Sequence, residues 1–311
     1  MKLKFYFSTF LAFSLTIIIL TLPSQCLSLA LNGLNLWFER MIPTLFPFMV
    51  LSGVVIRMNL TGSFVKICNP VLGRIFSVRS PCVYGMVIGF LCGFPMGAHV
   101  AAQLYGQKQV TRAEASFLLA FCNNIGPVYF LSFVLPTLGL KRPGPFLFGM
   151  YALPFLYGLF LRYTVFKDIG KKEGEKTAKA RSLSLLEALD DAIFQSLFGI
   201  AKLGGYMIFF NLLFILPALA RQAFSLGEPF GGLLAGGAGC LLEITGGITQ
   251  LGSRAPYLAL CILPFGGLSC IAQTYSMVKS TDLSIGEYVM HKMVLTALTV
   301  FYYLFLAGTA F

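Results

Sequence analysis

The sequence predicts an all-α polytopic membrane protein with two internal repeats, each containing a broken or re-entrant hairpin segment. Of 311 residues, 57% are hydrophobic and only 11% are charged. Soluble domains carry roughly a quarter charged residues. The apolar residues form many segments rather than one anchor, and a helical span needs about 20 residues. These observations exclude a water-soluble enzyme and leave room for a single transmembrane unit over 1–311.

Hydrophobic blocks bounded by charged or turn residues follow one another along the whole chain. They run over 5–22, 41–60, 81–106, 116–138, 145–166, 192–219, 230–251, 256–278 and 288–311. The first block follows Lys2 and Lys4 and is longer than the apolar region of a signal peptide. We therefore expect an uncleaved first helix with a cytoplasmic N-terminus.

The long polar stretch 167–191 is rich in lysine, so the positive-inside rule places it in the cytoplasm. It separates repeat 1, about 36–166, from repeat 2, about 192–311. If every block crossed once, this basic loop would lie outside. A block 81–106 that enters and returns restores it to the cytoplasm. Whether block 256–278 also returns, and from which face, is left open by the distribution of charge.

The net charge of +11 is typical of a polytopic inner-membrane protein whose basic residues gather in cytoplasmic loops, so we expect no nucleic-acid partner. The 8 cysteines are scattered singly, without metal-ligand spacing, and we expect them to be small buried apolar residues. The sequence has no nucleophile elbow, phosphate-binding loop or zinc motif. We therefore expect no enzyme activity, no cofactor and no metal.

Block 81–106 is interrupted at its centre by Gly89, Gly93, Pro95 and Gly97, which an unbroken helix disfavours. Broken backbone at membrane depth must be buried in protein or line a polar cavity, because lipid cannot satisfy its amide and carbonyl groups. We therefore expect a re-entrant hairpin on a substrate path. A proline-kinked helix packed through its glycines is the alternative.

A short internal repeat supports this expectation. The segments Gly97–Tyr105 and Gly267–Tyr275 both read G-x4-A-Q-x-Y, and each follows a block interrupted by glycine and proline. Interrupted segments at corresponding places in two halves indicate a binding site near the middle of the bilayer.

Polar residues inside apolar blocks are the candidate site residues, because they are costly there. Glu243 could bind a proton, a cation or a substrate, or form a structural pair with Lys202. Asn123 and Asn124 precede Gly126 and Pro127, so they could bind substrate or cap a broken helix.

The amides and histidines complete the set of candidates. Gln103 and Gln273, one in each repeat, could face each other across the site or join helices. His99 lies near the expected hairpin tip and could change charge near neutral pH, although a packed histidine is the alternative. We expect His291, beside Lys292, to lie at the membrane interface without a function.

Four motifs together resemble the YlbJ-type sporulation integral membrane proteins, from about Pro43 to the C-terminus. The motifs are Gly93-Phe94-Pro95-Met96-Gly97-Ala98-His99, Asn123-Asn124-Ile125-Gly126-Pro127, Leu242-Glu243-Ile244-Thr245-Gly246-Gly247 and Phe265-Gly266-Gly267-Leu268-Ser269-Cys270-Ile271-Ala272-Gln273. This family belongs with the nucleoside-recognition, or Gate, domain proteins. The resemblance implies an architecture similar to the two-hairpin core of concentrative nucleoside transporters.

The resemblance also implies a role in endospore formation, with dipicolinic acid moved across the membrane surrounding the forespore, from the mother cell towards the spore. Helix N-termini at hairpin tips would suit this planar dianion. The family usually has lysine where this sequence has His99, which makes anion binding pH-dependent. The substrate-binding residues expected on these grounds are Gly93, Pro95, Gly97, His99, Gln103, Asn123, Asn124, Glu243, Thr245, Ser269 and Gln273.

We expect a lipid-embedded transporter that works by alternating access at a midplane site, with Glu243 either taking a coupling proton or arranging neighbouring donors. The alternatives are a nucleoside or nucleobase transporter, a non-transporting sporulation scaffold and a lipid-active enzyme. A transporter should not tolerate Glu243→Gln or Asn124→Ala, whereas a scaffold should. Homo-oligomerisation and the choice of proton or sodium as coupling ion stay open.

Overall fold

The computed structural model describes residues 2–170 and 183–309, and all regular secondary structure in these ranges is helical, as predicted. The part of the basic loop over 171–182 lies outside the described residues. The first half comprises α1 (Lys2–Thr21), α2 (Pro23–Leu36), α3 (Ile42–Arg57), α4 (Thr61–Phe64), α5 (Asn69–Phe76), α6 (Ser80–Cys92), α7 (Met96–Gly106), α8 (Arg112–Phe121), α9 (Pro127–Tyr129), α10 (Leu135–Thr137), α11 (Pro143–Leu147) and α12 (Leu153–Tyr163). The second half comprises α13 (Leu185–Leu212), α14 (Ile215–Ala223), α15 (Phe230–Leu242), α16 (Ile244–Leu251), α17 (Pro256–Ile262), α18 (Gly267–Val278) and α19 (Ile285–Thr309).

Within the described ranges, 5 helical stretches are long and apolar enough to cross a membrane. They are Pro23–Arg57, Pro143–Tyr163, Leu185–Ala223, Pro256–Val278 and Ile285–Gly308. A sixth is present if α5 and α6, which are bent by 102° from each other, form one span. Large apolar side chains such as Phe194 on α13 and Phe301 on α19 are exposed, as expected of helices that contact lipid. The protein is therefore a multi-pass membrane protein.

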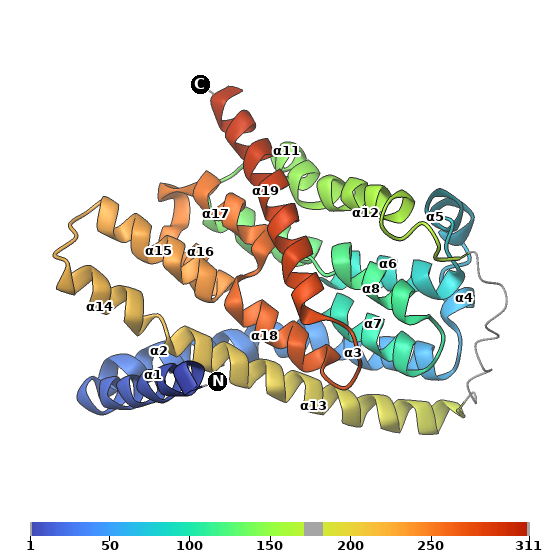
Figure 1. Cartoon of the computed structure of the whole chain (residues 1–311), viewed down its shortest axis with the longest axis horizontal. Coiled ribbons are helices and arrows are strands. Elements are labelled where there is room, and N and C mark those ends of the chain that lie inside the picture. The colour runs from blue at the N-terminus through green and yellow to red at the C-terminus, as the bar shows by residue number, and fades with distance from the viewer. Residues whose placement is uncertain (1, 171–182, 310–311) are drawn as a thin grey trace.

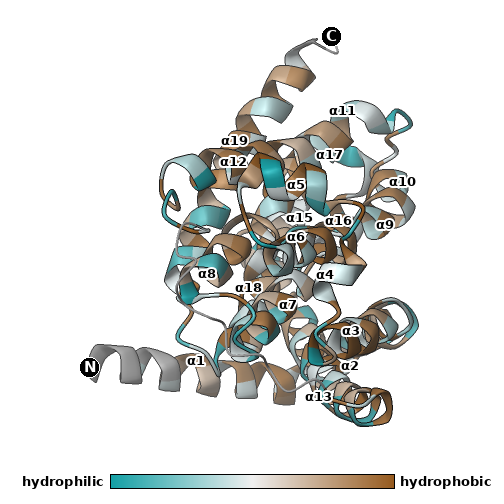
Figure 2. Ribbon diagram, turned by 90° about the vertical axis from the view of Figure 1, so that its right-hand side faces the viewer, coloured by the Kyte–Doolittle hydropathy of each residue, from teal (hydrophilic) through white to brown (hydrophobic). Residues whose placement is uncertain are grey.

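The long helix α13 runs beside α2 and α3 along one edge of the molecule, and α6, α7 and α8 lie above this layer (Figure 1). Helix α19 crosses the other elements and contacts α8, α12, α17 and α18. Seen from the side, hydrophobic residues run along most helices and hydrophilic residues gather in connections such as the one between α10 and α11 (Figure 2). The polar connections are those expected of a protein that lies in a bilayer.

The break predicted in block 81–106 lies between α6 and α7. These helices have 13 and 11 residues, which gives lengths of about 20 and 16 Å against a hydrocarbon core of about 30 Å. Neither helix is long enough to cross alone, and the two pack side by side (Figure 1). They form a helical hairpin with its tip at 93–95.

The second half has a helical hairpin in block 230–251, where the sequence analysis placed no break. Helices α15 and α16 pack together and are separated by Glu243, whose backbone is extended at φ −147° and ψ 121°. In block 256–278, helix α17, a 3-10 turn at Leu263–Phe265 and helix α18 follow one another within a single candidate span. Gly266 and Gly267 thus mark a break inside a candidate span, in agreement with the broken segment predicted for this block. The internal repeat itself stays a prediction.

The buried side chains form two clusters that meet where α8 ends. Helices α6, α7 and α8 contribute to the first cluster, in which Phe76 stacks on Phe121 at 5.7 Å between ring centroids. After the break at 122–126, α9 and α10 belong to the second cluster, together with α16 and α17. Most cysteines are buried or half-buried as expected, but Cys68 is exposed, so the expectation is wrong there.

Candidate functional site

The tip of the first hairpin lies against the break that follows α8. A Cβ atom on Gly93 would collide with the backbone nitrogen of Gly126, and a Cβ atom on Gly97 would lie 2.8 Å from the carbonyl oxygen of Cys122. Gly93 also has a φ of +78°, which glycine adopts without steric cost. The two breaks of the first half are therefore in direct backbone contact.

The two breaks of the second half reach the same place. A Cβ atom on Gly266 would lie 2.9 Å from Cζ of Phe94, and one on Gly267 would lie 2.9 Å from the carbonyl oxygen of Cys240. Hairpin tips and broken spans thus converge in the interior, as expected where irregular backbone must be buried in protein. We call this region the break centre and define it by 93–97, 122–126, 240–246 and 266–270.

Asn123 ties the break centre together with both ends of its amide. Its Oδ1 accepts a hydrogen bond from the backbone nitrogen of Ala98, at 3.3 Å, in the first turn of α7. Its Nδ2 donates to Thr274 Oγ1 at 2.9 Å and to the Tyr288 hydroxyl at 3.1 Å. Asn123 is fully buried. Asn123 therefore satisfies a backbone N–H at the start of α7, and the same side chain joins α7 to α18 and α19.

Asn124 forms one hydrogen bond to the end of α8 and one to α19. Its Nδ2 donates to the carbonyl oxygen of Phe121 at 2.5 Å, which satisfies the end of α8. Its Oδ1 accepts a hydrogen bond of 2.9 Å from Nζ of Lys292. A buried lysine is thereby brought into the break centre.

Lys292 is the residue that the sequence interpretation missed. Its side chain is 0% exposed, and Nζ lies 4.5 Å from the ring centroid of Phe94 and 5.7 Å from that of Tyr288. No carboxylate of the described chain pairs with it. The available signal was a lone lysine two turns inside an apolar helix, which by itself marks a functional candidate.

His291, next to it, is also buried inside the protein, while its place at the membrane interface stays a prediction. Its Nδ1 lies 2.7 Å from the hydroxyl of Tyr157 on α12. The reason is the packing of α12 against the first turns of α19, which the apolar pattern of α19 alone did not reveal.

Glu243 forms the tip of the second hairpin and caps α16. Its carboxylate accepts hydrogen bonds from the backbone nitrogens of Thr245 at 3.1 Å and Gly246 at 2.9 Å, and from Nδ2 of Asn211 at 3.4 Å. The pair with Lys202 is not formed, and across the described residues Glu243 has no cationic partner. The helix N-terminus supplies the positive end of a dipole instead.

The other predicted polar residues of the second half form one bond between elements and one within a helix. Thr245 Oγ1 accepts a hydrogen bond of 2.9 Å from the hydroxyl of Tyr129, which joins the second hairpin to α9. Gln273 donates from Nε2 to Ser269 Oγ at 2.9 Å, within α18. No hydrogen bond joins Gln273 to Gln103 among the described atoms, and whether they face each other across the site or join helices stays open.

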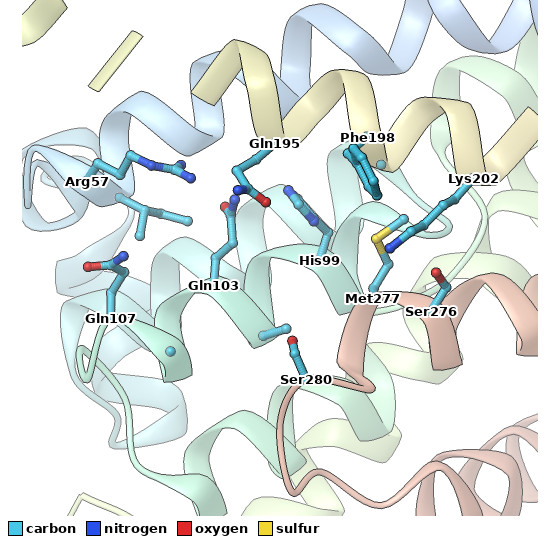
Figure 3. Close-up of a pocket in the computed structure, with 14 residues that line it drawn as sticks. Arg57, His99, Gln103, Gln107, Gln195, Phe198, Lys202, Ser276, Met277 and Ser280 are labelled. Carbon is cyan, nitrogen blue, oxygen red and sulfur yellow. The ribbon is translucent and has the colours of Figure 1, made fainter. Parts of the chain in front are cut away.

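A polar cavity of about 410 Å³ opens between α3, α7, α13 and α18. Arg57 from α3, His99 and Gln103 from α7, and Gln195 and Lys202 from α13 point towards one space (Figure 3). Gln107, Ser276 and Ser280 add further polar groups. This volume lies in the range of about 300–1,000 Å³ that is typical of small-molecule sites.

The charge of this cavity is its distinguishing property. No aspartate or glutamate is among its lining residues in the described chain. Asp191, with a largely exposed side chain, approaches Arg57 at 3.9 Å from outside the lining, while the Arg57 side chain itself is 12% exposed. Two buried atoms, Nε2 of His99 and Oε1 of Gln103, have no hydrogen-bond partner among the described atoms. Such atoms are costly unless a ligand or water meets them.

A second cavity, of about 610 Å³, lies between α14, α15 and α16. Its two cations, Arg221 and Arg254, approach the carboxylate of Glu228 at 3.0 and 3.8 Å. Because its positive charge is neutralised from within the lining, this cavity is the weaker candidate for an anion.

The predicted site residues therefore fall into two places. Those in the break centre are Gly93, Pro95, Gly97, Asn123, Asn124, Glu243, Thr245 and Ser269. Those in the cation-lined cavity are His99 and Gln103. Gln273 lies one turn beyond Ser269. Their contact with a substrate stays a prediction, and the described residues contain no cluster of possible metal ligands.

The chain is distantly similar to the sporulation integral membrane protein YlbJ of Bacillus subtilis (strain 168), with 23% identity over 219 residues. The match covers 64% of this chain and 53% of YlbJ, so the chain spans about half the length of that curated relative. No protein-family model matches the chain. No solved structure matches it either.

Proposed function

We propose that this protein moves a small organic anion across a membrane during endospore formation, and that the anion is dipicolinate, carried across the membrane that surrounds the forespore. The observation that carries this proposal is the cavity of about 410 Å³ lined by Arg57, Lys202 and His99 without an acidic residue. The distant similarity to the sporulation integral membrane protein YlbJ supports the biological setting.

The lining suits a planar aromatic dicarboxylate. The Arg57 guanidinium can hold a carboxylate with two parallel hydrogen bonds, and the Lys202 ammonium attracts the second carboxylate as a point charge. The Phe198 ring, which lies 5.1 Å from Lys202 Nζ, offers an aromatic face to the pyridine ring. Within the described residues, Nε2 of His99 and Oε1 of Gln103 lack a partner, and they can meet the remaining polar atoms of the anion, directly or through water.

Transport would proceed by alternating access around the break centre. Helix α7 carries His99 and Gln103 into the cavity and also begins at the first hairpin tip, so movement of the tip would change the cavity. In this scheme the two halves act as repeats, the N-terminus lies in the cytoplasm and Glu243 holds the second tip. The proposal assigns no enzyme activity to the chain.

Nucleoside or nucleobase transport is the second candidate, because the lining also contains Gln103, Gln107 and Gln195. Glutamine amides can donate to and accept from the polar edge of a base. A neutral nucleoside, however, gives no reason for two cations in a cavity without a carboxylate. The two functions differ in whether substrate binding depends on Arg57 and Lys202.

The test is uptake of labelled dipicolinate into liposomes that contain the purified protein. We expect wild type to concentrate dipicolinate and Arg57→Gln to lose uptake at least tenfold, because the variant removes the guanidinium fork from the cavity. Arg40→Gln is the matched control, since Arg40 lies in the same candidate span but is exposed.

Uridine and adenine uptake are measured in parallel. Uptake of either compound that is insensitive to Arg57→Gln, without uptake of dipicolinate, would replace the anion proposal with the nucleoside one. A protein that transports none of these compounds yet supports sporulation equally well with Arg57→Gln would be a scaffold.

A further inference from the structure

The buried side chain of Lys292 has unused binding capacity. An ammonium has three N–H donors, and within the described structure only Asn124 Oδ1 accepts a hydrogen bond from Nζ, at 2.9 Å. The rings of Phe94 and Tyr288 add attraction to their faces but no lone pair. No carboxylate of the described chain lies within ion-pair distance of Nζ.

Such a group makes the resting fold less stable. Moving an ammonium out of water costs several kcal/mol unless an anion compensates, and replacement by an apolar side chain of similar volume is often neutral or stabilising. Lys292 is 0% exposed and has no anion among the described residues. Its position is therefore explained better by an anion that arrives than by a contribution to packing.

The residues around Lys292 come from different segments of the break centre. Phe94 comes from the tip of the first hairpin, and its ring also lies against Gly266, the N-cap of α18. No side chain caps that helix end. The Phe94 ring thus covers Lys292 on the side of the α18 N-terminus, where backbone N–H groups and the positive end of the helix dipole would also favour a carboxylate.

We infer that Lys292 is a second anion-binding position, which receives a carboxylate of the transported anion when the Phe94 tip moves away from α19. This inference rests on the proposed function and adds a second binding position on the transport path of the same anion. The cavity at Arg57 binds the anion first. Lys292, which does not line that cavity, binds it after the tip has moved.

The inference predicts that a substitution of Lys292 lowers transport but not equilibrium binding. In Lys292→Met the first position stays intact, so equilibrium binding of dipicolinate to the purified protein should stay within about threefold of wild type. Uptake into liposomes should fall at least tenfold, because the second position has lost its charge. In Arg57→Gln both binding and uptake should fall. Lys279→Met, at the exposed end of α18, is the control and should behave as wild type.

Protein stability provides a readout that distinguishes a structural lysine from a functional one. The unfolding midpoint of Lys292→Met in detergent should equal or exceed that of wild type, since an uncompensated buried charge is removed. Lys292→Gln keeps a donor towards Asn124 and loses only the charge, and it should lose uptake to the same extent. Lower midpoints in both variants together with lost uptake would assign Lys292 to the fold and overturn the inference.

Two further outcomes are distinguishable. If wild type transports dipicolinate and Lys292→Met transports it within twofold at matched protein amounts, the inference is wrong while the proposed function stands. If wild type neither binds nor transports dipicolinate, the proposed function fails, and the inference fails with it.

Discussion

At each hairpin tip a helix begins inside the protein, and its first backbone N–H groups are capped by different residues at the two tips. At the second tip, Glu243 caps α16 with its own carboxylate, through bonds of 3.1 and 2.9 Å to the next backbone nitrogens. At the first tip, α7 receives its cap from a distant residue, Asn123, and its Phe94 ring rests on the ammonium of Lys292. The second tip is capped within its own segment and receives one further bond from Asn211 of α13, whereas the first tip depends on three other elements for its cap and its ring contact.

The difference indicates which tip is built to move. A cap within one segment survives any displacement of that segment, because donor and acceptor travel together. A cap that joins α7 to the break after α8 must be broken or carried along when the hairpin shifts. The first tip also borders the cation-lined cavity through His99, which follows it on α7. In the proposed alternating-access mechanism, the first hairpin would therefore be the moving part and the second hairpin the fixed support.

The largest expected effect on stability comes from Asn123→Ala. The change leaves the Ala98 nitrogen and the hydroxyls of Thr274 and Tyr288 without the amide, all in a buried place. At roughly 1–3 kcal/mol for an orphaned buried group, and with partial relaxation, we expect a loss of about 3 kcal/mol in unfolding free energy. Chemical denaturation in detergent measures it. A loss below that of Glu243→Ala would reverse the comparison between the tips.

Glu243→Ala should cost less, about 2 kcal/mol, because it removes one helix cap and leaves Asn211 one bond to the carbonyl oxygen of Met207. Glu243→Gln keeps one acceptor oxygen and should recover about half of that loss. The same denaturation experiment measures both. If Glu243→Gln is fully stable yet loses uptake, the carboxylate has a role in transport beyond the cap, as the coupling-proton hypothesis requires.

The base of the first hairpin predicts a pH effect. Arg79, which precedes α6, donates from Nε to the buried Glu114 at 3.0 Å and also from Nη2. Burial alone would raise the pKa of Glu114, but the hydrogen bonds from Arg79 and from the Thr111 backbone hold it below its usual 4.5. A lowered folded-state pKa stabilises the fold above the unfolded pKa. That contribution is lost as the pH falls through the folded value.

We therefore expect unfolding midpoints to fall with pH below about 4.5 in wild type and to vary less in Glu114→Gln. At neutral pH the variant should lose about 1–2 kcal/mol, less than a fully buried pair would, because the Arg79 side chain is 37% exposed and screened by solvent. Glu228→Gln, in the exposed pair near the second hairpin, is the matched control and should change stability by less than about 0.5 kcal/mol. Equal pH profiles for wild type and Glu114→Gln would contradict the assignment.

The smallest effect is expected for Tyr129→Phe. The variant removes one hydrogen bond to Thr245 Oγ1 and preserves the ring stacking on Phe133, at 5.0 Å between centroids. A single neutral bond contributes about 1 kcal/mol. Uptake should remain within twofold of wild type, since the second tip is held chiefly by Glu243. A loss of uptake would show that the second tip also moves.

Local signals in the sequence predicted the class of the fold and the backbone breaks well. The apolar blocks indicated a helical membrane protein, and the clusters around Gly93 and Pro95, around Asn123 and Gly126, and around Gly266 all mark true breaks. These features follow from the chemistry of glycine, proline and asparagine in a helix, which acts within a few residues. The hairpin at Glu243 was missed although Gly239, Gly246 and Gly247 flank it, because glycines at these positions also suit the close packing of an unbroken membrane helix.

The composition of the site could not be predicted, because it depends on tertiary packing. Arg57 is the last residue of α3 in the first half, and Lys202 lies within α13 in the second half. The sequence does not reveal that α3 and α13 pack together. Lys292 was misjudged for the same reason, since its burial results from α19 lying against the first hairpin tip. A single cation in an apolar helix is as strong an indication of function as the single carboxylate of Glu243.

The central claim, that the cavity at Arg57 and Lys202 carries dipicolinate towards the spore, is tested most directly by the dipicolinate content of spores from a strain that relies on this protein. At matched protein amounts, wild type and Arg40→Gln should restore dipicolinate, whereas Arg57→Gln and Lys202→Met should leave the spores with less than a tenth of that content. Equal dipicolinate in all four strains would contradict the account, as would its absence with a wild-type protein correctly inserted in the membrane.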